Sequence, residues 1–190
     1  AIRDERKRLS AQFKPQYEET YKEPFKRTAT LLDLADRPAT GAAMRSAWTR
    51  IANDPGINME DMRRVLGPIM GANPENLTDA QLARRLTQAI GSRPTEFRLL
   101  DYVKRGLDDV VENNPGLKET RDLRNAWREE LKTANPKYAS VLADYAREVE
   151  PLEELLNSAV GVLAKSKDTA LVSQVRGLLS SETKTPAGVV

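Results

Sequence analysis

Apolar residues recur at spacings of three and four along most of the chain, which is the period of an α-helix with one buried face. Runs that alternate apolar and polar residues, as half-buried strands do, are absent, and good helix formers such as Ala, Leu, Arg and Glu are frequent. The pattern predicts an all-α fold. We expect an elongated multi-helix bundle with a coiled-coil-like pair of helices toward the C-terminus, in a segment of a longer chain.

Residues 39–92 are predicted to form a small three-helix unit. The first helix spans 40–53, and the second runs from Met59 to Met70 with Gly71 as a stop. The third begins at Thr78, where Gln81 follows three residues later as in a capping box, and it ends at Gly91.

Residues 93–166 are predicted to form a helical hairpin followed by a long helix. The hairpin pairs residues 95–113 with 117–134, and Gly106 inside its first helix indicates the close approach of another backbone. The following segment has a heptad seam, interrupted by Pro151, with apolar residues at Tyr138, Leu142, Tyr145, Val149, Leu152, Leu156, Ala159 and Leu163.

The two ends of the chain carry weaker signals. Residues 1–38 are predicted to be a polar arm or helix, with a first helix that ends before Pro15 and Tyr17, Tyr21 and Phe25 at spacing four after it. Residues 167–190 are predicted to hold a last amphipathic helix, Asp168 to Leu179, and a polar linker.

Four Asx-Pro junctions mark expected helix boundaries, because Asn or Asp can cap a helix that begins with Pro. A plain turn is the alternative for each. The junctions are Asp54-Pro55, Asn73-Pro74, Asn114-Pro115 and Asn135-Pro136.

Composition excludes most common enzyme chemistries. The 190 residues include no Cys and no His, so thiolate nucleophiles, histidine bases and His- or Cys-ligated metals are ruled out. Carboxylate, Lys, Tyr or Ser–Lys chemistry stays open, but no phosphate-binding loop occurs and the many glutamates are typical of a solvated helix face. We therefore expect no catalytic residue, no cofactor and no metal site.

The charge balance gives no global attraction to nucleic acid. Charged residues make up 31% of the chain, yet the net charge is only +2. Basic pairs occur at Arg63-Arg64, Arg84-Arg85 and Lys104-Arg105, and acidic residues lie within a turn of most of them. A solvated surface is favoured over a DNA groove at these pairs.

One stretch resembles a motif of large internal proteins of tailed bacteriophages. The helix Leu100-Asp101-Tyr102-Val103-Lys104-Arg105-Gly106-Leu107-Asp108-Asp109 is similar to their D-Y-V-K-[KR]-x-L-D-D pattern. It is followed, as in them, by Leu123-Arg124, then by Asn135-Pro136-Lys137-Tyr138-Ala139 and by Tyr145. The similarity covers about 50 residues and does not extend to the regions before 93 or after 165.

The resemblance implies a structural virion protein that acts in genome ejection from short-tailed phages. Such a protein is held in the capsid near the portal and later forms a conduit for DNA across the host envelope. The implied partners are further copies of the chain, the portal or other ejection proteins, nearby DNA without sequence specificity, and the host envelope after ejection. Two alternatives stay open: a non-catalytic helical region of a larger virion-associated enzyme, such as a lytic transglycosylase or virion polymerase, and a helical protein-binding adaptor.

Overall fold

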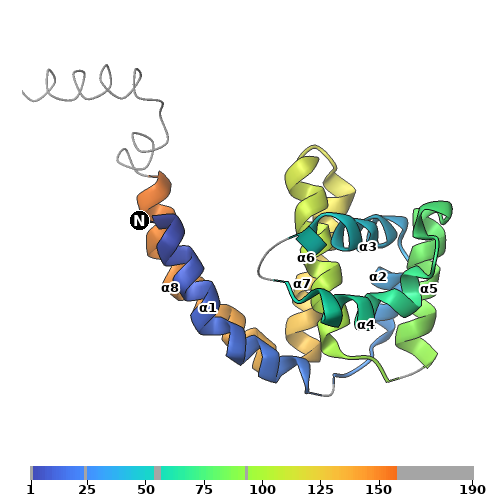
Figure 1. The fold of residues 1–190 in the computed structure, drawn as a ribbon, viewed down its shortest axis with the longest axis horizontal. Helices are drawn as coiled ribbons and strands as arrows, with labels where there is room; N and C mark the ends of the chain where they lie inside the picture. The colour runs from blue at the N-terminus through green and yellow to red at the C-terminus, as the bar shows by residue number, and fades with distance from the viewer. Residues whose placement is uncertain (1, 24, 54–56, 93, 158–190) are drawn as a thin grey trace, which may run out of the picture. The chain divides into compact units, whose positions relative to one another are not determined.

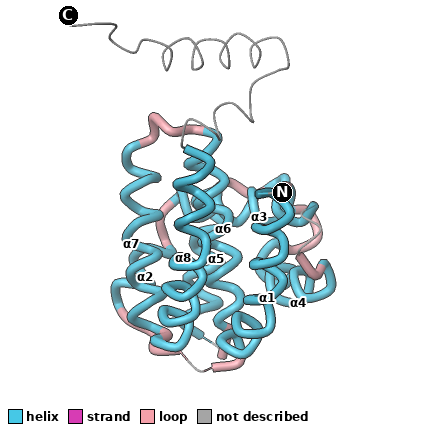
Figure 2. Tube along the Cα trace, turned by 90° about the vertical axis from the view of Figure 1, so that its left-hand side faces the viewer, coloured by secondary structure: helices cyan, strands magenta, loops and turns pink. Residues whose placement is uncertain are grey.

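The computed structural model describes residues 2–23, 25–53, 57–92 and 94–157, which are helical throughout apart from their connections (Figures 1 and 2). The all-α fold is confirmed, and no strand occurs among the described residues. The elements, in chain order, are α1 (Ile2–Tyr21), α2 (Ala29–Ala35), α3 (Pro38–Thr49), the 3-10 turn η1 (Ile51–Asn53), α4 (Met59–Met70), η2 (Pro74–Asn76), α5 (Asp79–Ser92), α6 (Phe97–Asn113), α7 (Lys118–Ala134) and α8 (Pro136–Asn157).

The chain divides into two compact units. Among the described residues, the larger unit spans 14–142, and the smaller one combines residues 2–13 with residues 143–157. In the larger unit α3 packs against both α5 and α6, and α7 packs against α6, which confirms the predicted hairpin.

Two glycines allow the close packing of α3 in the larger unit. A Cβ atom at Gly106 would lie 2.0 Å from the carbonyl oxygen of Ala43. A Cβ atom at Gly41 would lie 1.8 Å from the carbonyl oxygen of Asp79. The predicted close approach at Gly106 is therefore confirmed, and Gly41 plays the same part toward α5.

Local capping signals set several helix starts. Thr78 and Gln81 exchange the two hydrogen bonds of a capping box before α5, as predicted. Asn135 caps α8 by accepting from the backbone N–H of Tyr138 at 3.0 Å. Asn73 precedes the short turn η2 without a side-chain cap, Asn114 ends α6, and the junction at 54–55 lies outside the described residues.

In the smaller unit, residues 2–13 of α1 contact α8 through a narrow apolar seam. Leu9, Phe13 and Val149 are buried, and the rings of Phe13 and Tyr145 meet edge-on with centroids 5.4 Å apart. Tyr145 and Val149 thus lie on the predicted heptad seam. The structure does not describe the side chains at the later seam positions 156, 159 and 163. The predicted helix Asp168 to Leu179 also lies outside the described residues.

The expected end of the first helix before Pro15 is wrong, because α1 continues to Tyr21. Proline removes one backbone hydrogen bond but does not prevent a helix whose flanking residues are well packed. Phe13 is buried on one side of Pro15, and Thr20 and Tyr21 are buried on the other.

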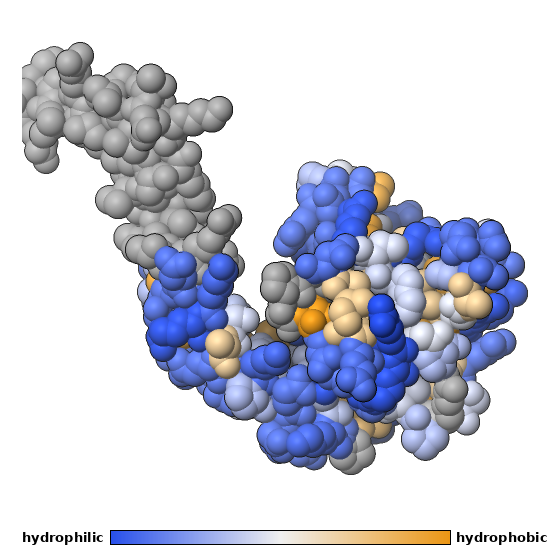
Figure 3. Space-filling model, viewed as in Figure 1, coloured by the Kyte–Doolittle hydropathy of each residue, from blue (hydrophilic) through white to orange (hydrophobic). Residues whose placement is uncertain are grey.

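The surface is mainly hydrophilic on the face drawn in Figure 3, where apolar side chains appear as a few small separate patches. Large hydrophobic side chains are exposed at Met59 (38%) and Leu117 (50%) among the described residues. No described helix is long and apolar enough to span a lipid bilayer.

Candidate functional site

The described part of the chain has one fully buried charged residue, Asp101, at the centre of a polar cluster in the larger unit. Asp101 is 2% exposed and lies on the buried face of α6. Its carboxylate accepts hydrogen bonds from the Tyr21 hydroxyl at 2.7 Å, the Tyr138 hydroxyl at 2.8 Å and Arg105 Nε at 2.9 Å. We call these four residues, together with Thr20 and Asn135, the Asp101 cluster.

Asn135 joins the C-terminal end of α1 to the start of α8. Its amide nitrogen donates to the carbonyl oxygen of Thr20 at 3.0 Å, while its amide oxygen accepts from the N–H of Tyr138. Thr20, Asp101 and Asn135 are three of the six buried polar residues in the described chain. Half of the buried polar residues therefore gather where α1, α6 and α8 meet.

Arg98 on α6 adds a charged contact beside the Asp101 cluster. Its guanidinium lies 4.6 Å from the centre of the Tyr21 ring, a cation–π arrangement. It also pairs with Glu18 of α1 and, at 3.5 Å, with Asp61 of α4. The end of α1 is thus attached by charges and aromatic rings as well as by apolar contact.

The electrostatics favour a charged Asp101 and neutral tyrosines. Burial alone would raise the pKa of Asp101, but the positive charges of Arg105 and Lys104 and the two tyrosine hydroxyls lower it below its usual value. Burial, followed by the nearby Asp101 charge, raises the pKa of Tyr21 and of Tyr138 well above the usual value of a phenol. The charge of Asp101 likewise raises the pKa of Arg105.

This arrangement holds a fold together and is poorly suited to proton transfer. A catalytic base needs a pKa near the working pH and access to a substrate. The Asp101 carboxylate is buried, has three donors and a lowered pKa, and lines neither of the hollows described below.

The structure brings together four of the residues that the sequence motif singled out, namely Asp101, Arg105, Asn135 and Tyr138, with Pro136 next to them in the chain. The others serve elsewhere. Tyr102, Val103 and Leu107 are buried in the core, while Lys104 and Arg128 both pair with Asp108. Asp109 accepts from Ser46 and pairs with Arg50, and Tyr145 contacts Phe13 in the smaller unit.

Sequence reasoning missed Tyr21, Thr20 and Arg98 as members or neighbours of this cluster. The spacing of Tyr17, Tyr21 and Phe25 could have drawn attention to Tyr21, since it is the spacing of aromatic rings on one side of a helix, but it gives no signal for Thr20 or Arg98. Tyr17 and Tyr138 contact edge-on with centroids 5.8 Å apart, and Phe25 contacts Phe97 at 5.9 Å.

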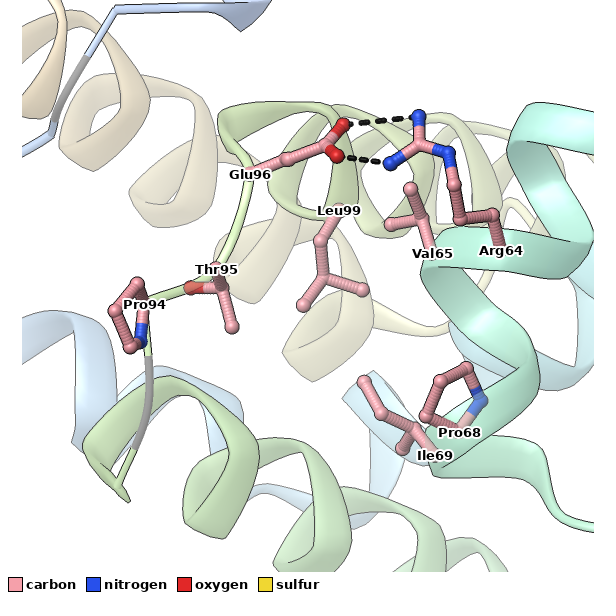
Figure 4. Close-up of a pocket in the computed structure, with 8 residues that line it drawn as sticks. All are labelled: Arg64, Val65, Pro68, Ile69, Pro94, Thr95, Glu96 and Leu99. Carbon is pink, nitrogen blue, oxygen red and sulfur yellow. Dashed lines mark hydrogen bonds and ion pairs between the residues drawn. The ribbon is translucent and has the colours of Figure 1, made fainter.

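The hollow in Figure 4 lies between α4 and the start of α6 and has a volume of about 220 Å³. Val65, Pro68, Ile69 and Leu99 form its apolar side, and an ion pair between Arg64 and Glu96 crosses one edge. A second hollow of about 560 Å³ shares Arg64 and Glu96 and is lined on its other side by Tyr21 and Arg98. Cations and carboxylates mix in both linings, so neither hollow has the charge of an anion site or a metal site.

No three potential metal-ligating side chains come together among the described residues. Comparisons of the chain with protein-family models, with curated proteins and with solved structures found no match.

Proposed function

We propose that the chain is a structural, non-catalytic component of a tailed-phage particle that acts in genome ejection. The resemblance of residues 100–109 and 135–145 to internal virion proteins supports this role. The contacts of those residues support a structural role as well, because Asp101, Asn135 and Tyr138 use their polar atoms to connect helices of the fold.

The observation that carries the proposal is the buried carboxylate of Asp101, which accepts three hydrogen bonds. Its three donors come from α1, α6 and α8, so the residues that make the motif recognisable are those that connect these helices. Proteins that share the motif would then share a helical scaffold and not a reaction. Their function would reside in surfaces that contact other chains.

The proposed partners are further copies of this chain and other virion proteins such as the portal, with host envelope contact after ejection. The resemblance supports these partners. The seam of Phe13, Tyr145 and Val149 is filled within the chain, where α1 packs on α8, so an oligomer contact would lie on other surfaces.

Mass spectrometry of purified virions tests the role. We expect peptides of this chain in intact particles, at a fixed ratio to the portal protein, and their loss from particles that have released their genome. Absence from intact virions, or retention after genome release, would contradict the proposal.

Two further measurements separate the alternatives. A parent reading frame that encodes a lytic or polymerase domain would favour a region of a virion enzyme. Light scattering that finds only monomers, with or without virion proteins present, would favour an adaptor for another partner.

A further inference from the structure

Helix α7 has three chemically distinct faces. At about 100° per residue, its buried residues Leu123, Trp127 and Leu131 share one arc, which packs on the core. Its cations occupy a second arc of about 120° by the same geometry. These cations, which we call the α7 cationic stripe, are Lys118, Arg121, Arg124, Arg128 and Lys132.

The carboxylates of α7 lie on its third arc, where two of them border the stripe and two lie farther from it. They are Glu119, Asp122, Glu129 and Glu130. Glu130 accepts a hydrogen bond from Thr28, so part of this acidic arc faces α2. Opposite charges that mix evenly on a helix form a solvated surface, whereas charges sorted by face produce a local field.

The stripe keeps most of its charge uncompensated. Lys118 and Arg121 are exposed, and the guanidinium of Arg124 donates to the neutral side chain of Asn125. Arg128 pairs with Asp108, which also pairs with Lys104 of α6, and Lys132 pairs with Glu129. Counted with Lys104, the six cations thus have two carboxylates as ion-pair partners, Asp108 and Glu129. Helix α7 as a whole carries five cations and four carboxylates, so the positive charge is local to the stripe.

We propose that the α7 cationic stripe, together with Lys104, binds the phosphate backbone of duplex DNA. Positions 118 to 132 extend about 21 Å along the helix axis, with a cation about every 5 Å. Duplex DNA has one negative charge per about 1.7 Å of its axis, so a linear row of this length can meet several phosphates. Three of the five cations are arginines, whose planar guanidinium forms paired hydrogen bonds with phosphate.

The geometry favours DNA over an anionic membrane. A helix that lies on a bilayer inserts its apolar face among the lipids. In α7 that face is already buried against the core, where the indole N–H of Trp127 donates to the carbonyl oxygen of Leu100 at 3.1 Å. The contact proposed for DNA is made to the backbone, so it carries no sequence preference.

The inference deepens the proposed function by naming a partner for it, but purified components suffice to test it. We would measure the fluorescence anisotropy of a labelled 30-base-pair duplex titrated with the full chain, over a series of salt concentrations. The test variant replaces Arg121→Glu and Arg124→Glu together. The matched control replaces Arg63→Glu and Arg84→Glu, which are exposed on α4 and α5 and change the net charge equally.

We expect the wild-type chain to bind at low salt, with affinity that falls steeply as salt rises. Each phosphate contact contributes about −0.9 to the slope of log affinity against log salt, so the test variant should reduce the slope by about 2. It should also bind at least tenfold more weakly, while the control stays within threefold and circular dichroism shows both variants folded.

Three outcomes would overturn the inference: no binding of the wild-type chain at low salt, equal loss in both variants, or binding to phosphatidylserine vesicles without binding to DNA. Each leaves the virion test untouched, because a chain can reside in the particle without contacting the genome. A chain that binds DNA through α7 yet is absent from virions would contradict the proposed function alone.

Discussion

At the scale of the residue, the Asp101 carboxylate is the buried charge on which the polar contacts between α1, α6 and α8 converge. Asp101→Asn keeps the shape of the side chain but removes its charge, which leaves Arg105 beside a neutral amide and changes the hydrogen bonding of Tyr21 and Tyr138. Breaking a buried ion pair costs about 3–5 kcal/mol. Since the Arg105 side chain is 38% exposed, we expect a loss near the lower end, measured as the free energy of urea unfolding.

Asp122→Asn is the matched control for this variant, because Asp122 is exposed on α7. An exposed substitution of this kind changes stability by no more than about 0.5 kcal/mol. Equal unfolding free energies for the two variants would show that the Asp101 cluster contributes little to stability.

Sequence reasoning recognised some residues of this cluster and not others for a physical reason. Asp101, Asn135 and Tyr138 belong to a recognisable string of residues, although nothing in that string indicates that their side chains converge. Tyr21 contacts Asp101 from 80 positions away in the chain. Only tertiary packing brings such groups together, and no local pattern encodes it.

At the scale of the element, the packing of α3 on α6 depends on Gly106. Gly106→Ala would place a methyl group against the Ala43 carbonyl and force the two helices apart, at a cost of about 1–3 kcal/mol, as for other overpacked contacts. Gly116→Ala, in the connection between α6 and α7, is the control, since the added methyl group would have no heavy atom within 4 Å other than those of its chain neighbours. Gly116 has no positive φ, so alanine fits its conformation and should stabilise the chain by about 0.4–1 kcal/mol, because it reduces the conformational freedom of the unfolded state.

The two variants should therefore shift the thermal unfolding midpoint in opposite directions, measured by circular dichroism at 222 nm. A higher unfolding midpoint for both variants would mean that α3 and α6 can move slightly apart without loss of stability. That result would remove the argument that the glycine is kept for close approach.

The helices of the larger unit were the most predictable elements because their signals are local. Helix α4 has the predicted bounds, Met59–Met70, and α5 begins after the predicted capping box. The course of α1 past Pro15 was not predictable, because the cost of a proline is offset by side chains that pack far away in sequence. The division of the chain into units has the same origin, since residues 2–13 join residues 143–157 from the other end of the described chain.

At the scale of the whole molecule, the cluster makes stability depend on pH at alkaline values. A group whose pKa is raised by folding stabilises the folded state below its unfolded pKa, and this contribution is lost as the pH rises. Tyr21 and Tyr138 both have raised pKa values, so their contribution should fall above about pH 10, the usual pKa of tyrosine. The pKa of Asp101 is lowered, so its contribution is present above about pH 4 and is lost only in stronger acid.

Urea unfolding at pH 8, 10 and 11 measures this dependence. Well above pH 10, each tyrosine that ionises only on unfolding lowers the free energy of unfolding by about 1.4 kcal/mol per pH unit. The two tyrosines together lower it by about 2.7 kcal/mol per pH unit. The double variant Tyr21→Phe, Tyr138→Phe should be less stable at pH 8 but lose less stability between pH 10 and 11. Absorbance at 295 nm should show both hydroxyls of the wild-type chain ionising together with unfolding. If the free energy of unfolding fell equally with pH in the two proteins, the two hydroxyls would ionise as readily in the folded state as in the unfolded state. The Asp101 carboxylate between them would then be accessible to water and not buried.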